Sequence, residues 1–154
     1  MKKMKKSMVR LTAMVLGILA VLGVLMPALS YQGGTYMGYE VAFNYEVANI
    51  EIEGFGSLAS AAIPYNMVAI GGYLAALFGI IVMVLSKKLA IVSVILFVAG
   101  GVLFLLVPTY AAFEFTIGGN TISQVVEWEL QYGLILSIVF AFLAALSSML
   151  YAAK

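Results

Sequence analysis

Glutamates are the residues of this 154-residue chain that come closest to forming a chemical site. The chain has seven of them, no aspartate, and neither histidine nor cysteine. Glu51 and Glu53 share one face of a predicted strand, and Glu46 precedes them on the same stretch. Calcium binds carboxylates, but it takes six to eight oxygens, and this spacing matches no known calcium loop. We therefore expect a solvated, electronegative strand face that favours a cationic partner, and no metal site.

The stretch Gly54-Phe55-Gly56-Ser57-Leu58-Ala59 matches the loose form of the dinucleotide-binding fingerprint. The full motif needs a parallel βαβ unit, with an acidic residue about 20 positions further on. The short polar segment around it has no room for such a unit. We expect no nucleotide site.

Nucleophilic catalysis lacks its usual parts in this sequence. Without histidine or cysteine, and without a lysine near the glutamates, no serine has a base to activate it. The same two absences exclude disulfides, thiolate metal sites and histidine-ligated haem. We expect that the protein is not an enzyme and has no cofactor.

The composition is that of a membrane protein, with 64% hydrophobic and 10% charged residues. A hydrocarbon core about 30 Å thick takes roughly 20 helical residues, and four apolar runs reach that length. The first run has a basic start and ends in Ala28-Leu29-Ser30, which also fits a cleaved secretory signal; its length favours a retained helix. The predicted spans are residues 9–29, 64–85, 89–108 and 130–151.

Ser86-Lys87-Lys88 sets the predicted topology. The two lysines form a tight turn between the second and third spans, and lysine-rich turns stay in the cytoplasm. This assignment places every basic residue inside and every glutamate outside. The basic residues are Lys2, Lys3, Lys5, Lys6, Arg10, Lys87, Lys88 and Lys154, and the acids are Glu40, Glu46, Glu51, Glu53, Glu114, Glu127 and Glu129.

The first outer segment, residues 30–63, shows the alternation of β-strands. Residues 41–47 alternate apolar and polar side chains, and residues 50–53 continue with the opposite parity. A two-residue turn at Ala48-Asn49 would join them into a hairpin that places Glu46 opposite Glu51.

The second outer segment, residues 109–129, predicts one further strand. Phe113, Phe115 and Ile117 alternate with polar residues, and Gly118-Gly119 predicts a turn. The pattern Thr121-x-x-Gln124 is a candidate capping box for the last helix. An interfacial aromatic belt is predicted from Trp128, Tyr132, Tyr31, Tyr65 and Tyr110.

Small residues recur every four positions along two spans. Such ridges let helix backbones approach closely in lipid. We expect them to pack the helices of one chain together, with an oligomer seam as the alternative. The ridges are Gly71, Ala75 and Gly79, with Gly72 and Ala76 beside them, in the second span, and Gly133, Ser137, Ala141 and Ala145 in the fourth.

This layout resembles the claudin-like tetraspan families. Both have inner termini, a long first outer segment of strands, a short inner turn and a shorter second outer segment, so the likeness covers the whole chain. The claudin signature, a tryptophan and a Gly-Leu-Trp run followed by two cysteines, is absent, and the single tryptophan is Trp128. The resemblance therefore implies a fold, and a junction-type barrier role by analogy of shape alone.

Together these patterns predict one membrane domain over residues 1–154: an all-α four-helix transmembrane bundle with a small extracellular antiparallel β-sheet. We expect a multi-pass protein of the plasma membrane with both termini cytoplasmic. It would be a non-enzymatic structural or scaffold protein, or a small accessory subunit of a membrane complex.

The predicted partners are the lipid bilayer and other membrane or extracellular protein subunits, including copies of itself, and not nucleic acid. The contacts would use lateral helix packing and an outer surface made by Glu46, Glu51, Glu53, Phe113 and Phe115. The alternative is an oligomeric pore or carrier, although the apolar runs hold no charged group that an ion relay would use.

Overall fold

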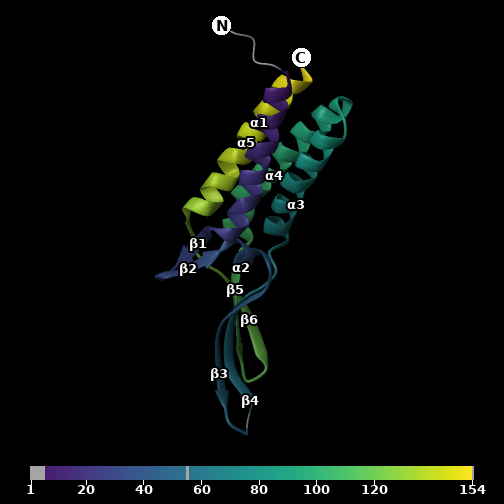
Figure 1. Ribbon diagram of the computed structural model, residues 1–154. Helices are drawn as coiled ribbons and strands as arrows, with labels where there is room; N and C mark the ends of the chain where they lie inside the picture. The colour runs from purple at the N-terminus through teal and green to yellow at the C-terminus, as the bar shows by residue number, and fades with distance from the viewer. Residues whose placement is uncertain (1–5, 55, 154) are drawn as a thin grey trace.

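The computed structural model describes residues 6–54 and 56–153. Four long helices run side by side, and two antiparallel sheets lie beyond one end of them (Figure 1). Within the described residues, four helices are long and apolar enough to cross a membrane. They are α1 (Lys6–Leu22), α3 (Met67–Leu85), α4 (Ala90–Tyr110) and α5 (Tyr132–Ala152).

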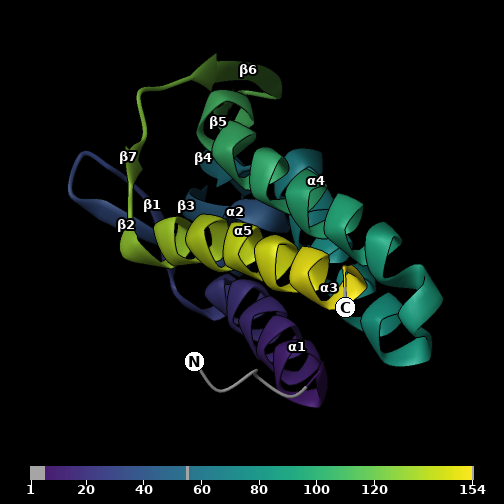
Figure 2. The ribbon, with the colours of Figure 1, turned by 90° about the horizontal axis from the view of Figure 1, so that it is seen from above.

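The long helices form a closed ring of neighbours. The α3 helix packs on α4, α4 on α5, α5 on α1, and α1 on α3. Figure 2 shows α5 between α1 and α4. Short elements join them: the 3-10 turns η1 (Gly23–Leu25) and η2 (Lys87–Leu89), and the five-residue helix α2 (Gly38–Ala42).

Glycines and serines bring the helix backbones close together. A Cβ atom on Gly72 would lie 2.7 Å from the Phe104 ring. Because glycine has no side chain, the Phe104 ring of α4 can pack directly against α3 at this position. Between α5 and α1, the Ser137 hydroxyl donates to the Ala20 carbonyl at 2.9 Å. Close backbone packing and hydrogen bonds of this kind associate helices in lipid.

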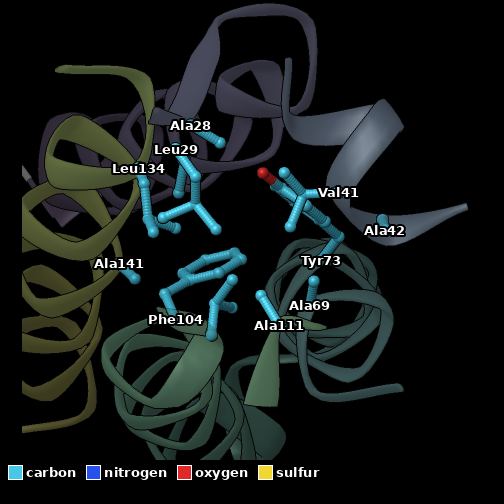
Figure 3. Packing of buried hydrophobic residues seen from close by; sticks show 12 residues of the cluster. Ala28, Leu29, Val41, Ala42, Ala69, Tyr73, Phe104, Ala111, Leu134 and Ala141 are labelled. Atoms are coloured by element: carbon cyan, nitrogen blue, oxygen red, sulfur yellow. The ribbon is translucent and has the colours of Figure 1, made fainter. Parts of the chain in front are cut away.

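The largest buried cluster lies where the helices meet the sheets (Figure 3). The rings of Tyr73 and Phe104 lie with their centroids 4.8 Å apart, and Leu29 from the first strand and Val41 from α2 close over them. All four side chains are at least nine-tenths buried. The segments that carry the sheets are therefore anchored on the helix ends by apolar packing.

The segments that join the long helices at this end form two sheets. The smaller has the order β2–β1–β7, from β2 (Gly34–Met37), β1 (Pro27–Tyr31) and β7 (Glu129–Leu130). The larger has the order β3–β4–β5–β6, from β3 (Tyr45–Ile52), β4 (Gly56–Ile63), β5 (Ala112–Ile117) and β6 (Asn120–Val125). The strand predicted around Phe113 and its turn at Gly118-Gly119 are confirmed; both glycines have positive φ.

The hairpin predicted at Ala48-Asn49 is wrong. The β3 strand runs unbroken through these residues and pairs with β4, so Glu46 and Glu51 lie on one strand and not opposite each other. The change of parity comes from a β-bulge between Glu46 and Ala48, because the extra residue shifts the alternation by one. Val41, expected in a strand, lies in α2.

Several helix boundaries also differ from the sequence patterns. The α3 helix begins at Met67, after the predicted start at residue 64, because Asn66 caps it. Thr121 lies in β6 and caps no helix; α5 begins at Tyr132, after β7. The first helical stretch ends at Leu25, before the predicted boundary at residue 29, and Pro27 begins β1. Proline cannot donate to a helix and holds the preceding residue extended, which Met26 is.

Charge divides between the two ends of the molecule. All seven glutamates lie in the sheet-bearing segments, while Lys6, Arg10, Lys87 and Lys88 lie toward the opposite end, near both termini (Figure 1). The Arg10 guanidinium donates from Nε to the Met83 carbonyl at 3.1 Å and from Nη2 to the Val84 carbonyl at 2.6 Å, which caps the C-terminal end of α3. The other basic residues, Lys2, Lys3, Lys5 and Lys154, lie outside the described residues.

Candidate interaction surface

The larger sheet has one mainly polar and one mainly apolar face, because most residues within each row of strand partners are of one kind. Strand partners that sit side by side project from the same face. Two rows are polar: Glu46–Ala62–Glu114–Ser123 and Asn49–Ser60–Thr116–Thr121. Two are mainly apolar: Ala48–Ala61–Phe115–Ile122 and Ile50–Ala59–Ile117–Asn120.

The apolar face is uncovered in the described chain. Ile50, Ile117 and Ile122 are 60%, 64% and 65% exposed, and a shallow hollow of about 190 Å³ lies among Ala48, Ile50, Ala59, Ala61, Phe115 and Ile117. Burying one side chain of this size contributes about 1.5–3 kcal/mol. A contiguous exposed apolar patch of this kind is typical of a protein-binding site.

The two edges of the sheet differ in charge. The edge strand β3 carries the carboxylates of Glu46 and Glu51, and Glu53 follows it in the turn. The strand at the opposite edge, β6, has no charged residue. Both edges offer backbone groups to a further strand, but β3 repels an acidic partner.

An aromatic cluster joins the two sheets. The Trp128 ring stacks on Phe113 with centroids 5.0 Å apart and meets Tyr31 and Tyr36 at 5.9 and 5.8 Å. The Trp128 indole N–H donates to the Ala111 carbonyl at 2.9 Å. Trp128 and Tyr31, expected in an interfacial belt, therefore hold the junction between the sheets.

Burial raises the pKa of the Tyr36 phenol above its ordinary value, and Tyr45 and Glu40 beside it act in the same direction. A hollow of about 330 Å³ opens next to the cluster and shares Ala61 and Phe115 with the apolar face. The apolar face and the aromatic junction thus form one continuous surface.

The residues predicted to form one contact surface do not all lie on the same face of the sheet. Phe115 is 37% exposed and belongs to the apolar face, whereas Phe113, at 4%, is buried in the aromatic cluster and presents no outer contact. Glu46 lies on the polar face, and Glu51 accepts a hydrogen bond from Asn49 Nδ2 at 3.1 Å. Within the described residues, no group of three acidic side chains lies close enough together to hold a metal ion.

Gly71, Gly72 and Gly79 of α3 face side chains of α4, and Ser137 of α5 bonds α1, whereas Gly133 packs against Met26 and Pro27 at the start of β1. Gly79, Gly133, Ser137, Ala141 and Ala145 are buried, while Gly71 and Ala75 are half-buried. Of the two neighbouring glycines of α3, Gly72 packs more tightly than Gly71. A Cβ atom on Gly72 would lie 2.7 Å from the Phe104 ring, whereas one on Gly71 would lie 3.3 Å from the flexible end of Leu103. Lys87 and Lys88 are exposed in η2.

Sequence reasoning missed the role of Asn66. Its side-chain oxygen accepts from the backbone N–H groups of Val68 and Ala69, each at 3.1 Å, and its amide donates to the Val107 carbonyl of α4 at 3.3 Å. The residue is 3% exposed. An asparagine directly before an apolar run is a helix-cap signal that could have been found.

Comparison with protein-family models, with curated proteins and with solved structures found no match to this chain. The chemistry of the surface itself is therefore the basis for assigning a role.

Proposed function

We propose that this chain is a multi-pass protein of the plasma membrane, with four transmembrane helices, both termini in the cytoplasm and the two sheets outside the cell. Four apolar helices of sufficient length support this placement. So does the separation of charge, because lysine and arginine near the ends of spans stay on the cytoplasmic side. The claudin-like resemblance belongs to the same proposal, as a likeness of layout.

The proposed role is non-enzymatic binding of another protein, as a scaffold or as an accessory subunit of a membrane complex. The observation that carries it is the uncovered apolar face of the larger sheet, with three isoleucines 60–65% exposed. On a part that stands in water such a face is a liability unless another protein covers it. The carboxylates along the β3 edge of the sheet favour a partner with basic groups at that edge.

Site-specific photo-crosslinking in intact cells tests this role. Neighbouring residues of β5 project from opposite faces, so Ile117 and Thr116 form a matched pair. Benzoylphenylalanine at position 117 should give a protein adduct of defined mass, and the same probe at position 116 should give much less. Equal yields at the two positions, or no protein adduct at 117, would overturn the proposal.

A conductance measurement separates this role from the oligomeric pore or carrier. Purified protein in a planar bilayer should be electrically silent if it acts through the sheet. A conductance that is unchanged by Ile117→Glu would place the activity in the helices and contradict the binding role.

A further inference from the structure

One edge of the larger sheet is protected against further strand pairing, and the other is open. Natural sheets protect an edge with charged side chains, prolines or β-bulges. The β3 edge carries the carboxylates of Glu46 and Glu51, and its register is broken between Glu46 and Ala48 and again between Ile50 and Glu51. The β6 edge has none of these features: the strand contains no charge and no proline, and its six residues pair with β5 in an unbroken register. A further strand can therefore be added at β6.

The backbone of β6 is arranged for such an addition. The turn at Gly118-Gly119 has two residues, both with positive φ, so Ile117 and Asn120 form the hydrogen-bonded pair that closes the hairpin. Hydrogen-bonded and non-hydrogen-bonded pairs alternate along a regular antiparallel ladder. Along the edge that no other described strand covers, the N–H and C=O groups that point away from β5 are therefore those of Thr121, Ser123 and Val125.

The side chains beside this edge indicate which strand would fit it. Directly opposed residues of neighbouring strands project from the same face. On the polar face, the row of Glu46 and Glu114 ends at Ser123, and the segments that carry the sheets contain no lysine or arginine. A basic residue of an added strand opposite Ser123 would lie about 10 Å from Glu114, two strand spacings away, and its long side chain can lean toward that carboxylate. Its neighbours on the other face would extend the apolar patch at Ile122.

A second copy of this chain does not supply such a strand. Its β3 edge is acidic, and acidic side chains beside Glu114 would repel. Its β6 would pair antiparallel with this β6 if a two-fold axis related the copies, and the β5–β6 hairpin points away from the helices (Figure 1). The helices of the two copies would then lie at opposite ends of the joined sheet, so both could not stand in one membrane. Another protein therefore fits the edge better.

We propose that the β6 edge binds an extended segment of another protein as a fifth, antiparallel strand, with a lysine or arginine opposite Ser123 and apolar side chains beside Ile122. The inference rests on the binding role proposed above, and it names the form and the charge of the partner.

Binding of synthetic peptides to the purified full chain in a neutral detergent tests the strand addition. A short peptide of alternating isoleucine and lysine should bind, and it should slow amide hydrogen exchange at Ser123 and Val125 but not at Gln124, whose N–H already bonds β5. A peptide of alternating isoleucine and aspartate should bind about tenfold more weakly, because Glu114 repels it. No binding of the lysine peptide would overturn the proposal, and equal binding of the aspartate peptide would overturn the assigned charge.

Backbone methylation separates strand pairing from charge attraction. Directly opposed residues share a face, so the lysine N–H groups of the peptide are the ones that bond β6, and the isoleucine N–H groups point away. N-methylation of the lysines should therefore abolish binding, while N-methylation of the isoleucines should leave it nearly unchanged. The two methylated peptides carry the same charge, and equal binding of both would contradict strand pairing.

A matched pair of variants tests the same bond from the side of the protein. Ser123→Pro removes an N–H that only an added strand would use, and Ser123→Ala keeps it. Ser123→Pro should bind the lysine peptide about tenfold more weakly than Ser123→Ala does, because one hydrogen bond is lost and the proline ring obstructs the edge. The two variants should melt at the same temperature, since the pairing of β5 with β6 is unchanged. Equal affinity of the two variants would refute the proposal.

Two further outcomes separate this inference from its alternatives. If the parent chain dimerises in detergent and Ser123→Pro stays monomeric, a second copy occupies the edge, and the assignment to another protein is wrong. In cells, a crosslinked adduct at position 117 that survives Ser123→Pro would leave the binding role of the apolar face standing and refute the strand addition. Absence of that adduct in the parent chain would refute the binding role itself.

Discussion

At the scale of single residues, polar side chains within the described helices form hydrogen bonds that connect one element to another. Asn66 closes the start of α3 and reaches across to α4, while Arg10 closes the end of α3 from α1. Ser93 donates to the Gly79 carbonyl and Ser137 to the Ala20 carbonyl. Each of these bonds satisfies a polar group that would be costly to leave unpaired in an apolar environment.

Asn66→Ala should destabilise the protein by about 1–2 kcal/mol, because it removes both acceptor contacts at the start of α3. For a chain of this length the melting temperature in detergent should fall by roughly 2–4 °C per kcal/mol. Asn66→Ser, which keeps a capping oxygen, should lower the melting temperature less than Asn66→Ala does. Asn44→Ala is the matched control at an exposed position and should melt like the parent; equal losses at the two sites would contradict the capping role.

At the scale of elements, the sequence predicted the four apolar helices and the strand around Phe113 because their signals are local. Length and hydropathy identify the helices, and period-two alternation before a Gly-Gly turn identifies β5. The returning strand β6 was not predicted, because Thr121 and Gln124 also fit a capping box. The β3–β4 hairpin was missed because a bulge reverses the parity of β3 without breaking the strand. Alternation alone cannot tell such a bulge from a two-residue turn.

The candidate surface was predicted only in part for a related reason. Alternation placed Phe113 and Phe115 on one face, but their burial depends on what that face meets. Phe113 lies under the smaller sheet, where Trp128 stacks on it, and Phe115 lies beyond that cover. Contacts between segments distant in sequence decided this difference, and no local pattern carries them.

The contrast between Gly71 and Gly72 tests which glycine packs α3 against α4. Gly72→Ala should cost about 1–3 kcal/mol, because the new Cβ meets the Phe104 ring. Gly71→Ala should be neutral or slightly stabilising, since Leu103 can yield and alanine favours the helix. The melting temperatures of both variants in detergent test this contrast. A larger fall for Gly71→Ala than for Gly72→Ala would show that α3 packs on α4 through Gly71 instead.

At the scale of the whole molecule, the division of charge makes a prediction about sidedness. The chain has no cysteine, so a single introduced cysteine reports one position without background. Glu53→Cys, beyond the end of β3, should react with a membrane-impermeant maleimide in intact cells. Lys87→Cys should react only after permeabilisation. Labelling of Lys87→Cys from outside intact cells would reverse the proposed orientation, and with it the environment of the sheets.

The position of Trp128 has a practical consequence. As the single tryptophan of the chain, it accounts for all the indole fluorescence, and it sits where the smaller sheet closes against the larger. Its emission maximum therefore reports whether the two sheets are in contact. A partner that separates the sheets would expose Trp128 to water and shift the emission to longer wavelength. A partner that binds without separating them would leave the emission at short wavelength, and neither measurement needs an added label.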